Sequence, residues 1–192
     1  MARSSIKPSR AEILLSWEIE GLKTYAREVL LFLESRISQS PEDLDDWIRP
    51  DGSLSERELL RSAYDVALFS VNERLNAVVD GMLLHAARSD EDLEPRDQAG
   101  AQNRSRATLV RAIEQAHNIR LRFISGWNVV EKVRDDANAT KHRLGTTLIY
   151  RNQLGINELR TIKLSLNDVH ERIAAVESWL REIIRVTEKH TT

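Results

Sequence analysis

The chain has 192 residues, a net charge of −2 and 41% hydrophobic residues, which suits one domain with a single sizeable core. The near-neutral charge excludes a strong overall attraction to nucleic acid or to membrane surfaces. Cys is absent, which excludes disulfides, thiolate zinc sites and Cys nucleophiles and fits a reducing compartment.

Helix-breaking residues are scarce, with 7 Gly and 4 Pro in the whole chain, and this composition favours long helices. No apolar run approaches the roughly 20 residues that span a bilayer. The first residues also lack the apolar core of a signal peptide. We therefore expect a cytoplasmic protein with no membrane partner.

The first helix is predicted to begin at Ser9, because Ser9 and Glu12 have the spacing of a capping box. Apolar residues then recur close to the helical period, which predicts one face packed against a core. These positions are Leu14, Trp17, Leu22, Tyr25, Val29, Leu33 and Ile37. A loop is expected at 38–54, where two prolines and an Asp-Gly pair interrupt the pattern.

A second helix is predicted from near Ser55 to about Ala87, again on the helical period. Its expected core positions are Leu60, Tyr64, Ala67, Val71, Leu75, Val78 and Met82. The next segment, 88–103, is acidic and contains Pro95 and Gly100, so we expect a second loop there.

Two more helices are predicted, one from about Arg104 to Ile124 and one from Trp127 to about His142. Short stretches rich in β-branched residues follow at 146–150 and 159–164, and they predict a small β-hairpin. A lone hairpin is marginal in water, so we expect it to rest on the helices or on a partner chain.

A last helix is expected from about Asn167. The predicted fold class is thus all-α: a single domain over 1–192, built as a bundle of four to five helices with a small β-hairpin inserted before the C-terminal helix.

Metal and cofactor chemistry have little basis in the sequence. Glu114 and His117 form one E-x-x-H pair of the kind that di-metal bundles use, but no second copy follows. Arg111 and Arg120 lie beside it and disfavour a cation, so His117 is better explained as a core or interface histidine. Phosphate-loop, dinucleotide-binding and nucleophile-elbow motifs are absent, and we expect no metal and no cofactor.

A polar stripe near the end of the fourth predicted helix is the strongest candidate site. Arg134, Asn138 and His142 are spaced by four residues and therefore share one helix face. The planar guanidinium of an Arg suits a phosphate, and a His with an ordinary pKa near about 6.5 can transfer a proton. These are the groups that metal-independent RNA cleavage needs. The alternative is a solvated helix end, where cations complement the helix dipole.

Neighbouring residues add to the stripe. Lys141 lies beside it and Arg143 follows at the helix end. Asp135 and Asp136 lie on adjoining faces, where we expect them to hold the basic groups by hydrogen bonds.

The segment from Arg134 to His142 resembles the motif of the HEPN superfamily of small all-α domains. Many members are metal-independent RNases of toxin–antitoxin, CRISPR and phage-defence systems, and others are non-catalytic partners. Their motif is an Arg, often followed by Asn, Asp or His, and a His after four to six further residues. Here seven residues separate Arg134 from His142, and Asp135 follows the Arg.

The resemblance implies a role for each matching residue. Arg134 would hold the scissile phosphate, His142 would act as acid or base, and Asp135 would orient one of them. The implied substrate-binding residues are Asn138, Lys141 and Arg143. It also implies a homodimer in which two motifs form one composite site, with RNA as the substrate.

Three functions remain open from the sequence. The first is a HEPN-like endoribonuclease or toxin-type effector. The second is a non-catalytic helical module that binds another protein, as the partner of such an effector. The third is binding of a small anionic ligand or nucleotide at the same stripe without turnover.

Overall fold

The structure, a computed structural model, describes residues 8–40, 55–89, 105–142, 147–151, 157–161 and 163–188. Its helices are α1 (Arg10–Tyr25), α2 (Leu31–Gln39), α3 (Glu56–Ser89), α5 (Arg106–Ala116), α6 (Trp127–His142) and α7 (Leu166–Glu188). A π-helical turn, Ala26–Leu30, joins α1 to α2, and a 3-10 turn, Leu121–Phe123, lies between α5 and α6. The predicted helical fold class is confirmed. The predicted loops at 38–54 and 88–103 fall almost entirely outside the described residues.

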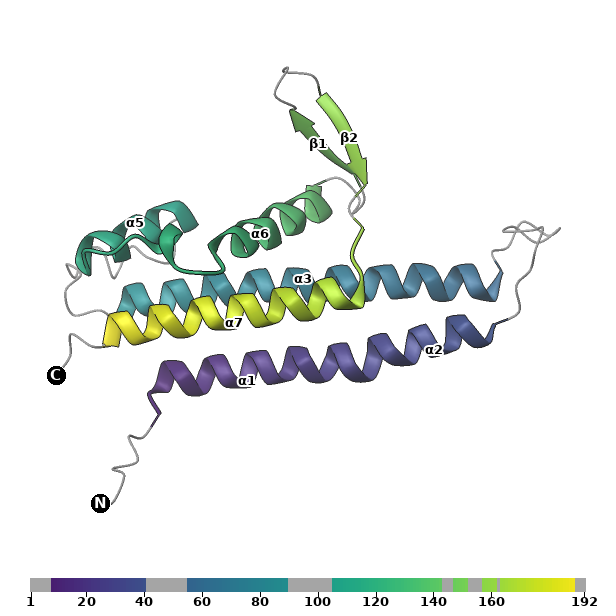
Figure 1. Ribbon diagram of the computed structural model, residues 1–192, viewed down its shortest axis with the longest axis horizontal. Coiled ribbons are helices and arrows are strands. Elements are labelled where there is room, and N and C mark those ends of the chain that lie inside the picture. Colours follow the sequence, from purple (N-terminus) through teal and green to yellow (C-terminus); the bar gives the residue numbers. More distant parts are fainter. Residues whose placement is uncertain are drawn as a thin grey trace.

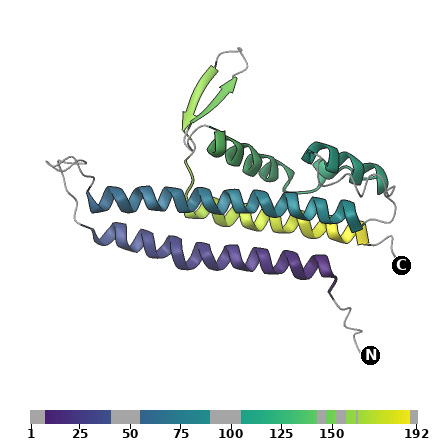
Figure 2. The ribbon, with the colours of Figure 1, turned by 180° about the vertical axis from the view of Figure 1, so that it is seen from behind.

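The helices lie in three layers (Figures 1 and 2). The continuous rod of α1 and α2 forms one outer layer, α3 and α7 form the middle layer, and α5 and α6 form the other outer layer. Contacts join α3 and α7 to each other, to α1 and to α6, as this order requires. Because each outer layer covers one side of α3 and α7, the core lies on both sides of these two helices.

Between α6 and α7 the structure has two short strands, β1 (Thr147–Arg151) and β2 (Asn157–Thr161). They pair antiparallel, with Ile149 opposite Leu159. The side chains of both strands lie outside the described residues. The described core residues lie on the helices and the helical turns.

The first helix corrects one prediction. Its buried residues are Ala11, Leu15, Ile19 and Leu22, followed by Ala26 and Leu30 in the π turn. Trp17, Leu14 and Tyr25, which were predicted to face the core, are 80%, 40% and 39% exposed. The helix carries two apolar faces, and spacing alone could not decide which one the rest of the chain covers. The second face remains on the surface.

The other predicted core faces are confirmed in large part. The buried residues at predicted positions are Ala67, Val71, Leu75, Val78 and Met82 on α3, Val130, Val133 and Ala137 on α6, and Val169, Ile173, Val176, Leu180 and Ile183 on α7. Trp179 is fully buried and stacks at a tilt on Trp127, with 5.6 Å between the ring centroids. Its Nε1 donates to the carbonyl of Leu121 at 3.2 Å, so this large side chain is packed and hydrogen-bonded.

Helix starts follow the predicted capping chemistry. The Ser9 hydroxyl accepts from the Glu12 N–H at 3.1 Å, and the Glu12 carboxylate accepts from the Ser9 N–H at 2.9 Å. This reciprocal pair is the predicted capping box. Ser165 and Asp168 form the same arrangement at the start of α7.

The third predicted helix ends earlier than expected, at Ala116 instead of Ile124. Asn118 has a left-handed backbone with φ of 50°, and the N–H of Ile119 donates to the carbonyl of Glu114 at 3.1 Å. This six-residue closure is the Schellman pattern that ends helices, and Asn is one of the few residues that adopt its left-handed position readily. Leu121, which follows it, is buried from a 3-10 turn rather than from an α-helix.

Candidate functional site

The polar stripe of α6 lies partly within the described residues. Asn138 and Asp135 are exposed, and Arg134 is half-buried. His142 is the last residue of α6, but its side chain and that of Lys141 lie outside the described residues, as does the whole of Arg143. The structure therefore brings Arg134 and Asn138 to one accessible face and leaves the catalytic pairing with His142 as a prediction.

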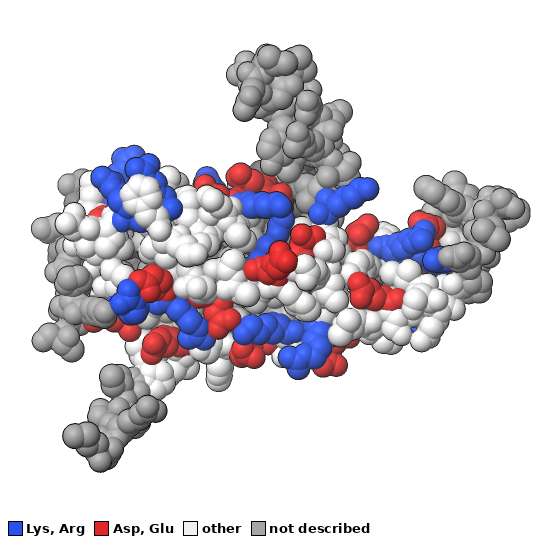
Figure 3. All heavy atoms as spheres, in the orientation of Figure 1, with Lys and Arg blue, Asp and Glu red and all other residues white. Residues whose placement is uncertain are grey.

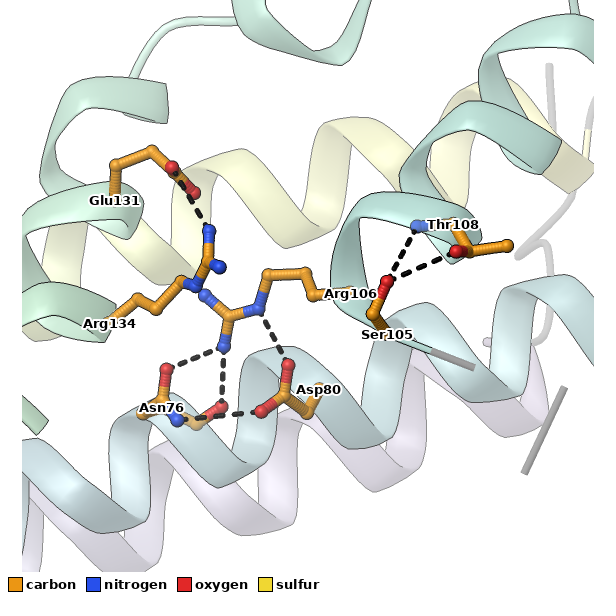
Figure 4. Close-up of polar contacts among 7 residues, drawn as sticks. All are labelled: Asn76, Asp80, Ser105, Arg106, Thr108, Glu131 and Arg134. Carbon is orange, nitrogen blue, oxygen red and sulfur yellow. Dashed lines mark hydrogen bonds and ion pairs between the residues drawn. The ribbon is translucent and has the colours of Figure 1, made fainter. Parts of the chain in front are cut away.

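Arg134 already has a partner inside its own helix. Its Nη1 lies 3.4 Å from Oε2 of Glu131, one turn earlier, and Figure 4 shows the guanidinium directed toward that carboxylate. The two side chains are 39% and 33% exposed. An ion pair with this much solvent contributes little, so a phosphate could compete for the guanidinium.

Asp136 has a different role from the one predicted. It is 3% exposed, and its Oδ2 accepts from Nη2 of Arg172 on α7 at 2.6 Å. Nη1 of Arg172 donates to Asn72 of α3 at 2.6 Å, and Asn72 donates to the carbonyl of Val133 at 3.1 Å. Asp136 is therefore an anchor between α6 and α7 instead of a support for the exposed basic residues.

A second buried arginine extends this polar arrangement along α3. Arg106, the first residue of α5, donates through Nε to Asp80 at 2.6 Å and through Nη2 to the Asn76 side chain at 2.5 Å (Figure 4). Asn72 and Asn76 are one helical turn apart, so each holds the arginine of a different helix. We call Asn72, Asn76, Asp80, Asp136, Arg106 and Arg172 the polar spine.

The polar spine was missed by the sequence analysis, although a signal existed. Asn72, Asn76 and Arg172 interrupt apolar stripes at positions that the helical period assigns to the core. A buried polar residue needs a partner, so such interruptions indicate residues that bond across helices. The spine fixes how α5, α6 and α7 lie on α3.

Glu114 and His117 are likewise structural. A carboxylate oxygen of Glu114 accepts from the N–H of Leu121 at 2.8 Å, and Arg120 lies 3.6 Å from the other. His117 is 7% exposed, as predicted for a core histidine. Within the part of the chain that the structure describes, no group of three or more Asp, Glu or His side chains could hold a metal ion. In the same part, no helix is long and apolar enough to cross a membrane.

The surface where α1 and α3 meet is hollowed and rich in apolar side chains. A hollow of about 470 Å³ opens between these two helices. Its lining comprises Trp17, Glu18, Gly21, Leu22, Tyr25, Ser70, Val71 and Arg74. Large apolar side chains continue beyond it, each at least 40% exposed: Ile13 and Leu14 on α1, Leu31 and Phe32 on α2, and Leu59 and Val66 on α3. We call this surface the α1–α3 face.

The charges within the α1–α3 face neutralise each other. Arg74 donates to both carboxylate oxygens of Glu18, with Nη2 at 2.7 and 2.6 Å. This bidentate pair bridges α1 and α3 at the edge of the hollow. Figure 3 shows the same balance over the visible surface of the molecule, where Lys and Arg lie beside Asp and Glu. An occupant of the hollow therefore meets apolar surface and an ion pair that is already satisfied.

Comparison of the chain with family models, with curated proteins and with solved structures found no match. In the part of the chain that the structure describes, the geometry is that of a three-layer helical bundle with an exposed apolar face and a polar stripe.

Proposed function

We propose that this protein is a non-catalytic helical interaction module that binds a protein partner through the α1–α3 face. The observation that carries the proposal is the 80% exposure of Trp17 beside the hollow between α1 and α3. Single exposed apolar residues are ordinary, but contiguous apolar patches mark interaction sites. Trp is also the residue type most enriched among residues that dominate binding energy.

Covering the α1–α3 face is favourable because it removes apolar surface from water. A buried Trp covers about 150–250 Å², and apolar area is worth about 25 cal/mol per Å², so covering Trp17 contributes about 4 kcal/mol before entropic costs. A hollow of about 470 Å³ is within the size range of binding pockets. Because the hollow lies between two neighbouring helices, it suits an amphipathic helix or a helical hairpin as the partner.

The test is photo-crosslinking in cells that make the protein. A benzophenone amino acid replaces Trp17 in one variant and Phe123, which is 76% exposed on the opposite outer layer, in the control. The proposal predicts one discrete crosslinked species from position 17 and none from position 123. No species from position 17, or equal diffuse labelling at both positions, would contradict it.

We retain a second candidate, the metal-independent endoribonuclease or toxin-type effector acting at Arg134 and His142. Its support is that Arg134 and Asn138 share an accessible face of α6, and that Asp136 anchors this helix to α7 from the buried side. A rigid helix with a solvent-facing phosphate binder is what such a site would need. Asp135 would act as the orienting residue, with Lys141 and Arg143 as further substrate contacts.

The assay for this candidate is RNA cleavage by the purified chain in EDTA. Cleavage that persists in EDTA and disappears in both His142→Ala and Arg134→Ala is the expected result. Glu131→Gln serves as the matched variant, because it releases Arg134 from its partner without removing it. Unchanged cleavage in His142→Ala, or none at any protein excess, would dismiss the candidate.

We also propose that the hairpin of β1 and β2 forms a second contact with the partner. Two strands alone are marginal in water, so β1 and β2 are expected to keep their pairing only against α6 or a partner. Hydrogen exchange of the Ile149 and Leu159 amides, measured with and without the partner found at position 17, tests this expectation. Exchange at the unfolded-chain rate in both states would remove the hairpin from the binding surface.

A further inference from the structure

Resting on the proposed interaction module, we infer that the α1–α3 face binds a second copy of this chain. The two α1 helices would run antiparallel around a two-fold axis at Gly21. The α1–α3 pairs of both copies would then form a four-helix bundle, with Trp17 of each copy covered by the other.

The spacing of aromatic residues along α1 favours a symmetric pair. Trp17 and Tyr25 both line the hollow, and each lies four residues from Gly21, which also lines it. In an antiparallel pair with its axis at one residue, positions equally far from that residue lie opposite each other. Trp17 of one copy therefore lies opposite Tyr25 of the other, so that aromatic anchors meet on both sides of the axis. A two-fold interface needs a patch that is complementary to itself, and this spacing supplies one.

The second observation is the open space at Gly21. Gly21 is exposed, and a Cβ built there would meet no atom within 4 Å. The position of the inferred axis is therefore accessible in the single chain.

The pattern on α3 is the third observation. The exposed residues Leu59, Ala63, Val66 and Ser70 are small or apolar and follow spacings of four, three and four, and Glu73 then occupies the next position of the repeat. This is the repeat of 3.5 residues that lets two helices pack along a seam. The α3 stripe flanks the hollow on the side opposite α1, so a second pair of helices meets a two-helix surface.

The fourth argument is charge. The lining of the hollow holds one acidic and one basic residue, Glu18 and Arg74, and these pair within the chain. Two identical faces can therefore meet without like-charge repulsion. A strongly basic or acidic partner would find no counter-charge there, and this favours a neutral, self-complementary occupant.

The other outer layer offers no equal surface among the described residues. Phe123 is as exposed as Trp17, but it stands alone, and the guanidinium of neighbouring Arg122 lies 4.9 Å from its ring centroid. This cation–π contact already covers part of the ring. Phe123 therefore provides the matched control for exposure without a patch.

The test uses the absence of Cys from the chain, so that each introduced Cys is the only one present. Gly21→Cys places a thiol at the axis, where an added Cβ meets no atom of the single chain within 4 Å. Leu14→Cys and Glu28→Cys, each seven residues from Gly21, are made on chains carrying tags of different length. Gln115→Cys, exposed on α5, is the control.

Under mild oxidation, Gly21→Cys is expected to form a disulfide dimer and Gln115→Cys is not. In the mixture, Leu14→Cys is expected to link to Glu28→Cys, which only an antiparallel pair allows. Links of each variant to itself would show a parallel pair and overturn the geometry. A Gly21→Cys chain that folds but yields no dimer would overturn the inference.

The same experiment separates this inference from the function on which it rests. If Gly21→Cys fails to dimerise and a benzophenone at position 17 crosslinks a different protein, the interaction module stands and the second copy is wrong. If position 17 crosslinks nothing, both proposals are wrong.

Discussion

At the scale of single residues, the polar spine shows how burial changes the contribution of an ion pair to the stability of the fold. Asp136 and Arg172 are 3% and 5% exposed, whereas Arg134 and Glu131 are both partly in water. Removing one member of a buried pair leaves a charge without its partner and without solvent, while an exposed pair is replaced by hydration. The two pairs share α6, so they can be compared in one helix.

We expect Asp136→Ala to lower the free energy of unfolding by about 3–5 kcal/mol, because Arg172 would keep its charge in the core. Glu131→Ala, the matched change at the exposed pair, should cost less than about 1 kcal/mol. Urea titration followed by circular dichroism measures both. Equal losses in the two variants would show that the buried pair does not anchor α6.

The second residue-scale prediction concerns pH. Burial alone would raise the pKa of Glu177, but hydrogen bonds from Lys23 and Arg181 outweigh it and hold that pKa below its ordinary value of 4.5. A lowered pKa means that folding favours the charged carboxylate. This stability is fully present above pH 4.5 and is lost as the pH falls through the folded-state pKa.

Glu177→Gln should therefore lower the stability of the chain at neutral pH. The difference in stability between this variant and the wild type should shrink as the pH falls below 4.5. Thermal unfolding across that range provides the readout. The control is Glu56→Gln, at a pair with Arg36 in which both side chains are about half exposed. A gap between Glu177→Gln and the wild type that stays constant with pH would contradict the argument.

At the scale of elements, the turn between α5 and α6 depends on Gly126. Its φ is +99°, and a Cβ there would lie 2.8 Å from the carbonyl oxygen of Ala175 on α7. Both the backbone conformation and the close contact require glycine. Gly81 in α3 has the opposite situation, because an added Cβ would meet nothing within 4 Å.

Gly126→Ala should destabilise the chain by more than about 1 kcal/mol, and Gly81→Ala should stabilise it by about 0.5–1 kcal/mol through helix propensity. Paired chemical denaturation of the two variants measures the difference. The account of the turn would be wrong if Gly126→Ala were as stable as the wild type.

The elements also show what sequence can predict here. Capping chemistry at Ser9 and the apolar periods of α3, α6 and α7 identified those helices, because both signals are local. The early end of α5 depends on the left-handed conformation of Asn118, which an isolated Asn only permits. The π turn at Ala26–Leu30 had no recognised signal, and it lies directly after Tyr25, within the stretch that carries the α1–α3 face.

Of the candidate sites, the stripe on α6 followed from spacing, whereas the α1–α3 face did not. Trp17 and Leu15 both fit a helical apolar stripe, and only the packing of α3 and α7 decides which one is buried. Which of the two apolar faces becomes buried depends on how the layers assemble. For the same reason the sequence analysis did not identify the polar spine, whose members come from four helices.

At the scale of the whole molecule, α1 and α2 cover one side of the middle layer and α5 and α6 cover the other (Figure 1). The α1–α3 face, where α1 and α3 meet, stays exposed. Trp179 is completely buried in the core, whereas Trp17 stays in water on the α1–α3 face unless a partner covers it. The account therefore predicts that Trp17→Glu changes assembly and leaves the fold of the single chain intact.

Sedimentation equilibrium of the wild type, Trp17→Glu and Phe123→Glu over a wide concentration range tests this claim most directly. The account predicts twice the chain mass of 22.0 kDa for the wild type and for Phe123→Glu, and the single-chain mass for Trp17→Glu. A wild-type chain that stays at 22.0 kDa at every concentration, or a Trp17→Glu chain that pairs as the wild type does, would contradict it.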